Sequence, residues 1–216
     1  NALINRRLFQ YEEVIHIVEK LNAIDTSSDT LKNKIIYAAF SNELVIRINL
    51  VQIDAAEKIA DRIIESLEKN KIVDKADEVT IYYNISVLKF LKENYKEANY
   101  WLGKIINELA LDVRSDFQSF ARILRLIIHY EMGKIDLVEY SIKSTYRFLS
   151  KKNMLYKTEK ILLNFIRTKV QRLNNSASTH SAFKQLKMEI TEAAEDIKES
   201  AVLNYFDFIS WLESKI

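Results

Sequence analysis

The chain of 216 residues has no proline, no cysteine and only two glycines, Gly103 and Gly133. Because proline and glycine mark the tight turns of β-hairpins, their scarcity favours helices that are joined by short polar turns. The lack of cysteine excludes a disulfide framework, a thiolate metal site and a cysteine nucleophile. With 48% hydrophobic residues, a chain of this length can still bury a substantial core.

Signals for membranes, metals and catalysis are missing as well. No apolar run reaches the roughly 18 residues that a membrane span needs, and no signal peptide opens the sequence. The three histidines, His16, His129 and His180, have no partner at a metal-ligand spacing. Neither a Gly-rich phosphate loop nor a GxSxG motif occurs. We therefore predict a cytoplasmic protein that is not an enzyme, with no membrane association, metal, cofactor or catalytic residue.

One pattern recurs four times along the first 150 residues, each time just after a helical break. It starts at Tyr11, Ile53, Tyr95 and Ile135, at intervals of 42, 42 and 40 residues. A fixed period in this range predicts an all-α fold, a right-handed α-solenoid of antiparallel helical hairpins. The pattern continues three, seven and ten residues after each start, at Val14, Val18 and Leu21, at Ala56, Ala60 and Ile63, at Ala98, Leu102 and Ile105, and at Val138, Ile142 and Thr145.

Periodicity and capping residues place the helices of this repeat. Asp74 and either Asp112 or Ser115 are predicted N-caps, and Gly133 is predicted to form a turn. The predicted helices cover residues 3–8, 11–24, 30–50, 54–69, 74–93, 95–109, 115–132 and 135–149. Because the sequence starts inside a helix, we expect it to be a fragment of a longer protein.

After about residue 150 the repeat loses its regularity. We predict a long helix over 154–173, a polar loop over 174–179 and a helix over 181–198. A last helix over 201–214 has a broad apolar surface, and we expect it to cap the end of the repeat. The whole chain, 1–216, is predicted to be one domain, with regular repeats over about 3–150 and an irregular part over 151–216.

The segment 82–106 resembles a tetratricopeptide repeat. Ser86, Tyr95, Ala98 and Leu102 match the small and aromatic positions at which helices of that family approach each other. The resemblance covers about residues 3–150 and implies architecture, although the period is longer than the family's 34 residues or so and the usual proline is missing. The segment 114–173, together with 205–213, is similar to the C-terminal part of long bacterial repeat proteins, which implies no known activity.

The resemblance also implies an inner face built from the first helix of each hairpin. In that register Tyr83, Val87 and Phe90 lie on the inner face, without the Lys and Asn residues of a carboxylate clamp. An apolar groove there would suit an amphipathic helix or an extended apolar segment of a partner. The alternative is that these three residues belong to the core.

Basic charge is concentrated between residues 111 and 175, which contain 13 Lys and Arg but six Asp and Glu. Arg122, Arg125 and His129 lie along one side of a predicted helix, with Tyr130 beside them and Arg147 on the next helix. Because arginine binds carboxylates in a bidentate manner, we predict a site for an acidic partner there. The alternative is that these arginines pair with acidic residues of neighbouring helices. The excess of charge is too small to predict nucleic-acid binding.

The function predicted from these patterns is a non-catalytic interaction scaffold that recognises a protein or peptide segment. The alternative is a sensory or oligomerisation module of a larger transcriptional regulator, with a DNA-binding domain upstream. The sequence leaves open whether the chain forms a homo-oligomer.

Overall fold

The fold is described by a computed structural model, which covers residues 11, 13–21, 23–69, 74–108, 112–168, 176–200, 203 and 205–216. All regular secondary structure in these ranges is helical, which confirms the all-α prediction. None of the helices described there is long and apolar enough to cross a membrane. The chain divides into two compact units, Asn1–Leu109 and Ala110–Ile216, and a single domain over 1–216 stays a prediction.

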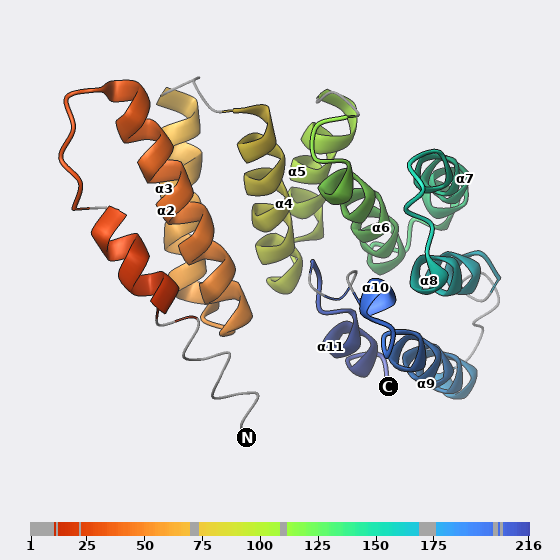
Figure 1. The fold of residues 1–216 in the computed structure, drawn as a ribbon. Helices are drawn as coiled ribbons and strands as arrows, with labels where there is room; N and C mark the ends of the chain where they lie inside the picture. The colour runs from red at the N-terminus through yellow and green to blue at the C-terminus, as the bar shows by residue number, and fades with distance from the viewer. Residues whose placement is uncertain are drawn as a thin grey trace. The chain divides into compact units, whose positions relative to one another are not determined.

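Four helices form most of the first unit, after a helical stretch at 13–21. Helices that are adjacent in sequence pack on each other, α2 on α3 and α4 on α5, and α4 also contacts α2 and α3 (Figure 1). Their common core contains Leu44, Ala60, Leu88 and Trp101, one residue from each helix. The bounds are α2 (Asp29–Asn49), α3 (Ile53–Lys69), α4 (Lys75–Leu91) and α5 (Tyr95–Glu108).

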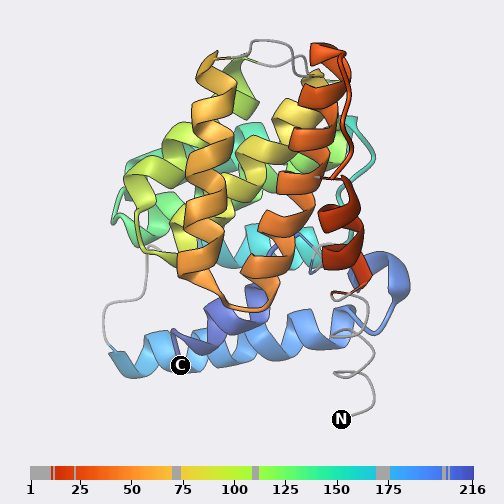
Figure 2. The same cartoon turned by 90° about the vertical axis from the view of Figure 1, so that its left-hand side faces the viewer.

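The second unit contains six helices among its described residues. Helix α6 packs on α7, α7 on α8 and α8 on α9, while the short α10 contacts α8. Helix α11 lies along the much longer α9 (Figure 2). The bounds are α6 (Ser115–Glu131), α7 (Ile135–Lys151), α8 (Lys157–Thr168), α9 (Ser176–Ala193), α10 (Ile197–Ser200) and α11 (Phe208–Glu213).

The turns that end α2, α4, α6 and α7 share one geometry. Each contains a residue with positive φ, namely Val51, Glu93, Gly133 or Asn153. The next amide N–H donates to the carbonyl oxygen five residues earlier, over 2.8–2.9 Å. This is the left-handed turn that commonly ends a helix and satisfies its last carbonyls. The turn residues Val51, Glu93 and Gly133 are 42 and 40 residues apart, which are the intervals of the sequence repeat. Each of them lies two residues before a repeat start.

The repeat positions are buried in the last three repeats and only in part in the first. In the first repeat Val18 is buried, while Val14 and Leu21 are partly exposed. In the later repeats the side chains three, seven and ten residues after each repeat start all point into the protein. These side chains are at most 8% exposed, and they are Ala56, Ala60 and Ile63 in α3, Ala98, Leu102 and Ile105 in α5, and Val138, Ile142 and Thr145 in α7.

Helices α4 and α6 are far more buried than α5 and α7. Every residue from Tyr83 to Phe90 is buried, and so is every residue from Gln118 to His129 except Arg122 and Arg125. Helices α5 and α7 each bury the side chains along one face only, so the side chains on their other faces are more exposed to solvent. The buried side chains are Ala98, Trp101, Leu102 and Ile105 in α5, and Val138, Ile142, Thr145 and Leu149 in α7.

The predicted bounds of α2 to α7 agree with the structure to within two residues. Asp74 is the N-cap of α4, and its Oδ1 accepts a hydrogen bond from the Ala76 N–H at 2.8 Å. The predicted cap of α6 is wrong. The N-cap is Arg114, with a φ of 47° and no capping side-chain bond, because Ser115 already belongs to the helix and Asp112 pairs with Lys152.

The C-terminal helices differ more from the prediction. Helix α8 starts at Lys157 and not at 154, because the turn at Asn153 leaves 154–156 without regular structure. Residues 176–179 belong to α9 and not to a loop, and α9 ends at Ala193 and not at 198. The last helix starts at Phe208, where Asp207 accepts a bond from the Ser210 N–H at 2.9 Å. The predicted helix at 3–8 and the end of the predicted helix 154–173 lie outside the described residues.

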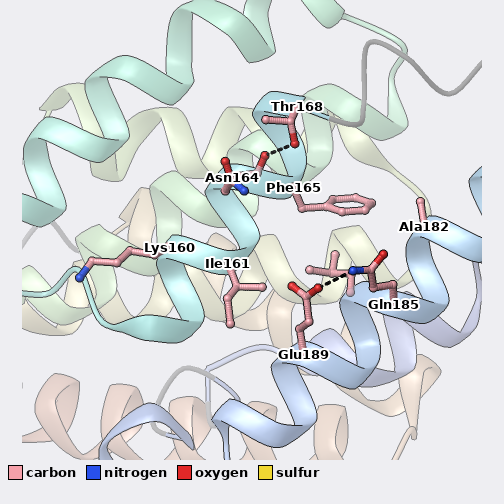
Figure 3. Close-up of a pocket in the computed structure, with 9 residues that line it drawn as sticks. Lys160, Ile161, Asn164, Phe165, Thr168, Ala182, Gln185 and Glu189 are labelled. Atoms are coloured by element: carbon pink, nitrogen blue, oxygen red, sulfur yellow. Dashed lines mark hydrogen bonds between the residues drawn. The ribbon is translucent and has the colours of Figure 1, made fainter.

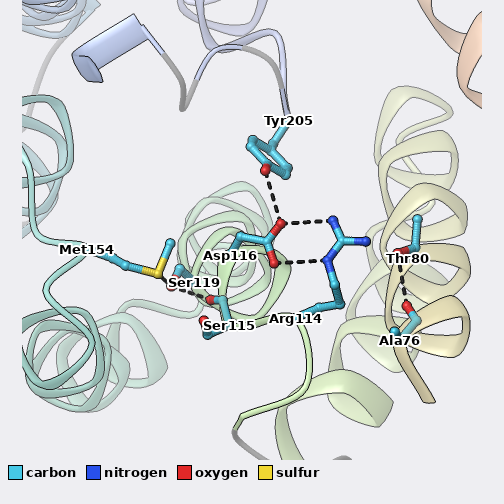
Figure 4. Close-up of polar contacts among 8 residues, drawn as sticks. All are labelled: Ala76, Thr80, Arg114, Ser115, Asp116, Ser119, Met154 and Tyr205. Carbon is cyan, nitrogen blue, oxygen red and sulfur yellow. Dashed lines mark hydrogen bonds and ion pairs between the residues drawn. The ribbon is translucent and has the colours of Figure 1, made fainter. Parts of the chain in front are cut away.

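Two carboxylates of α6 hold the C-terminal segment. Asp116 forms a bidentate pair with Arg114, over 2.9 and 3.1 Å, and accepts the Tyr205 hydroxyl at 3.1 Å (Figure 4). The Tyr205 ring stacks on Phe120, with ring centroids 3.8 Å apart. At the other end of α6, Glu131 accepts the Trp211 indole N–H and pairs with the Lys215 ammonium, each over 2.7 Å. These charge-assisted contacts hold the C-terminal segment against α6.

The shared turn geometry predicts stability changes of opposite sign at Val51 and Gly133. Val51 has a φ of 57° and its side chain is 77% exposed, so Val51→Gly should relieve strain without loss of packing. We expect the free energy of unfolding to rise by about 1 kcal/mol. Gly133 has a φ of 66°, so Gly133→Ala should lower the free energy of unfolding by about 1 kcal/mol. Urea denaturation measures both changes, and equal signs would contradict the shared geometry.

Candidate partner-binding surface

A pocket of about 310 Å³ lies between α7 and α8, and three of its lining side chains are cationic. Lys143 and Arg147 come from α7, where a spacing of four residues places them on one face. Arg167 comes from the last turn of α8. The other lining residues are Ile142, Tyr146, Leu163 and Asn164.

No carboxylate of the described residues lines this pocket, although the chain has nearly equal numbers of acidic and basic residues. Among the described residues, no acidic side chain pairs with Lys143, Arg147 or Arg167. Arg167 donates from Nη2 to the Asn164 amide oxygen over 3.0 Å. Three positive charges therefore share one pocket without local neutralisation, a field that attracts anionic groups.

A second pocket, of about 460 Å³, lies on the other side of α8, between α8 and α9. Its floor is apolar, with Ile161 and Phe165 of α8 facing α9, while Gln185 and Glu189 stand at its rim (Figure 3). Asn164 lines both pockets, so the basic pocket and this apolar pocket adjoin each other across one side chain of α8.

Of the residues that the sequence assigned to an acidic-partner site, Arg147 lines the basic pocket and Arg122 has other contacts. The Arg122 Nη1 donates to the Gln118 carbonyl at 2.9 Å and to its side-chain oxygen at 3.1 Å. The guanidinium carbon lies 3.8 Å above the Phe148 ring. Burial, and then the Arg125 charge, lower the Arg122 pKa to about 10, which still leaves the side chain cationic at neutral pH.

The remaining three residues of that set are at least partly buried. His129 is 4% exposed, and burial followed by the Arg125 and Lys134 charges lowers its pKa to about 4, so it is neutral at pH 7. Burial also lowers the Arg125 pKa. The Tyr130 ring packs 5.9 Å from Phe183, and burial raises its pKa. A partner-binding role for these residues stays a prediction.

The ion pairs that the structure shows for Asp116 and Glu131 do not involve Arg122, Arg125 or Arg147. Asp116 pairs with Arg114, two residues earlier in the chain, and Glu131 pairs with Lys215 after the end of α11. Pairing of the three arginines with acids of neighbouring helices stays a prediction. Glu159 has a different environment, since it is 4% exposed and its Oε2 accepts no hydrogen bond within the part of the chain that the structure describes.

The residues expected on an apolar inner face are Tyr83, Val87 and Phe90. All three are buried, with exposed fractions of 1%, 7% and 6%. The Phe90 ring contacts Tyr95 of the next helix, with centroids 5.5 Å apart. This burial favours the alternative that the three residues belong to the core.

Lys143 and Arg167 line the basic pocket although the predicted site does not include them, and Tyr146 lies beside the predicted Arg147. The spacing of Lys143 and Arg147 on an otherwise polar helix face was a usable signal. Arg167 had none, because only the packing of α8 on α7 brings it to the same pocket.

Comparison with protein-family models, with curated proteins and with solved structures gives no match for this chain. In the described ranges, no group of three or more potential ligand side chains could hold a metal ion. The proposed function of the basic pocket is therefore argued from the residues that line it.

Buried Glu159 predicts a pH dependence of stability. Burial, and to a smaller extent the Glu199 charge, raise its pKa from 4.5 to about 7. Because the folded state binds the Glu159 proton more tightly than the unfolded state, protonation of Glu159 stabilises the fold most below pH 4.5, and this stabilisation is lost as the pH rises through 7. Glutamine stays neutral at every pH. The free energy of unfolding of Glu159→Gln, relative to that of the native protein, should therefore increase by up to about 3 kcal/mol between pH 4.5 and 7.

Denaturation at a series of pH values measures this difference between Glu159→Gln and the native protein. Exposed Glu192 on α9 supplies the control substitution, Glu192→Gln. A Glu159→Gln difference that stays constant from pH 4 to 8 would contradict the raised pKa.

Proposed function

We propose that the chain is a non-catalytic binding module that recognises an acidic protein segment at the pocket between α7 and α8. The observation that carries the proposal is the group of Lys143, Arg147 and Arg167 around one pocket, which no carboxylate in the described part of the chain lines. A bound carboxylate would neutralise charges that the described residues leave uncompensated.

The two arginines and the lysine suit different parts of such a segment. The planar guanidinium groups of Arg147 and Arg167 can each bind a carboxylate through two parallel hydrogen bonds. The Lys143 ammonium adds a point charge one helical turn from Arg147. Tyr146, which is 49% exposed, can donate a hydrogen bond from its hydroxyl.

The adjoining pocket between α8 and α9 suits an apolar residue next to the acidic ones. Its floor contains Ile161, Phe165 and Leu186, a surface that accepts an apolar side chain. We infer a ligand with acidic residues over the basic pocket and an apolar anchor beside them. Asn164, which both pockets share, can bind the peptide backbone between these two parts.

The larger architecture in this proposal is a tetratricopeptide-like right-handed α-solenoid, in which antiparallel hairpins stack and the C-terminal segment caps the last one. It is supported by the sequential packing of the helices and by turns that recur every 40 to 42 residues. Such a frame serves as a scaffold, because its exposed helices can bind partners without a change of fold. The regulator alternative, homo-oligomerisation and a cytoplasmic location stay predictions.

Replacing both pocket arginines should abolish recognition of an acidic peptide. The probe is a fluorescein-labelled peptide with three glutamates followed by a leucine, and binding is measured by fluorescence anisotropy in low salt. We expect Arg147→Gln with Arg167→Gln to weaken binding at least about tenfold, because two charge-assisted contacts are lost. The melting temperature should hardly change, since neither arginine pairs with a described carboxylate.

The matched control is Lys184→Gln with Lys96→Gln, which removes the same charge from exposed positions outside the pocket. This variant should bind nearly as the native protein does. Equal binding by the peptide's glutamine analogue, or undiminished affinity of the double-arginine variant, would contradict the proposal.

A further inference from the structure

Three aromatic rings of the first unit surround one ammonium group. The Nζ atom of Lys104, on α5, lies 5.2 Å from the ring centroid of Tyr100, 5.8 Å from that of Tyr82 and 6.0 Å from that of Trp101. All three distances are within the range at which a cation is attracted to the face of an aromatic ring. We call Tyr82, Tyr100 and Trp101 the aromatic cluster.

The rings of the aromatic cluster are held in place by different amounts of burial. Trp101 is 8% exposed and belongs to the core that α2, α3 and α4 share. Tyr82 packs against this core, and its ring centroid lies 5.2 Å from that of Trp101. Tyr100 is 57% exposed, with its ring edge-on to Trp101 at 5.3 Å. The rings of Trp101 and Tyr82 are therefore held by the core, and the Tyr100 ring is open to solvent.

Acidic residues add a negative field around the cluster. Glu108 lies 3.8 Å from the Lys104 ammonium, and Glu78 accepts a hydrogen bond from the Tyr82 hydroxyl at 3.5 Å. Burial, followed by the Glu78 and Glu108 charges, raises the Tyr82 pKa to about 12. The tyrosine therefore keeps its proton at physiological pH. Glu78 also pairs with the Lys75 ammonium at 2.7 Å, so Glu108 is the carboxylate that contributes most to the attraction of a cation at the rings.

Lys104 lies at the rings through weak contacts. Its side chain is 23% exposed and its ion-pair partner Glu108 is 62% exposed, and a solvent-accessible pair of this kind contributes little to stability. The indole N–H of Trp101 has no hydrogen-bond partner among the described residues, so the ring contributes through its face and its apolar packing. A flexible lysine stem can leave the rings without disturbing the core.

We propose that the aromatic cluster, with Glu78 and Glu108, is a binding site for an ammonium-bearing side chain of a partner, and that Lys104 occupies it in the absence of that partner. A methylated lysine is the ligand that fits best, because its weakly hydrated cation gains most from aromatic faces. This site lies on α4 and α5, so it is separate from the proposed basic pocket and requires ligands of opposite charge.

Removal of Lys104 should open the site. The probe is tetramethylammonium chloride, and the readout is the indole N–H resonance of Trp101 in NMR spectra, which leaves Trp211 and its hydrogen bond to Glu131 intact. We expect Lys104→Ala to bind the probe about tenfold more tightly than the native protein, because the internal competitor is gone. Sodium chloride at the same concentration should cause no saturable change.

Two further variants keep the test decisive. Lys104→Gln retains most of the aliphatic part of the side chain, and it should also bind tetramethylammonium more tightly than the protein with Lys104. This variant keeps the test valid if Lys104→Ala does not fold. Tyr100→Ala added to Lys104→Ala removes the exposed wall of the cluster and should abolish saturable binding. Folded Lys104→Ala and Lys104→Gln proteins that show no saturable response, or a response that Tyr100→Ala leaves unchanged, would overturn the proposal.

Discussion

The structure depends on the nearly complete burial of α4 and α6. From Tyr83 to Phe90 and from Gln118 to His129 these helices are buried on almost every side, so they are stable only where other helices cover them. Helices α5 and α7 supply part of that cover with a single stripe of buried residues each. Their other faces are left to carry charged and aromatic side chains. Both proposed sites include side chains of these faces, Tyr100 and Lys104 on α5 and Lys143 and Arg147 on α7. The aromatic cluster also contains Tyr82 of α4 and the buried Trp101.

Much of this arrangement could be predicted from the sequence, because it depends on local signals. The repeat starts at Ile53, Tyr95 and Ile135 come directly after turns with positive φ at Val51, Glu93 and Gly133. Only one of these turn residues is a glycine, so the turns were visible through the apolar spacing after them rather than through their own composition. Spacing of three and four residues also identified the buried stripes of α3, α5 and α7.

The C-terminal region and the pockets could not be predicted in the same way, because contacts between distant residues determine them. Tyr205 is held by Asp116 and stacks on Phe120, which keeps it outside the helix that its apolar neighbours predicted. Arg122 looked like a binding residue, but it lies over the Phe148 ring. Arg167 enters the basic pocket only because α8 packs on α7. The distribution of charge along the sequence therefore identified the basic region of the chain. It did not identify which basic residues line the same pocket.

We propose that an acidic partner segment binds at the pocket between α7 and α8, and not at the buried side chains Tyr83, Val87 and Phe90 of α4. Chemical-shift mapping by NMR tests it most directly, with amide resonances monitored while an acidic peptide is added. We predict the largest chemical-shift changes at Tyr146, Arg147 and Arg167, with the resonances of Tyr83 and Phe90 unchanged. Shifts centred on Tyr83, Val87 and Phe90, with none on α7 and α8, would contradict it.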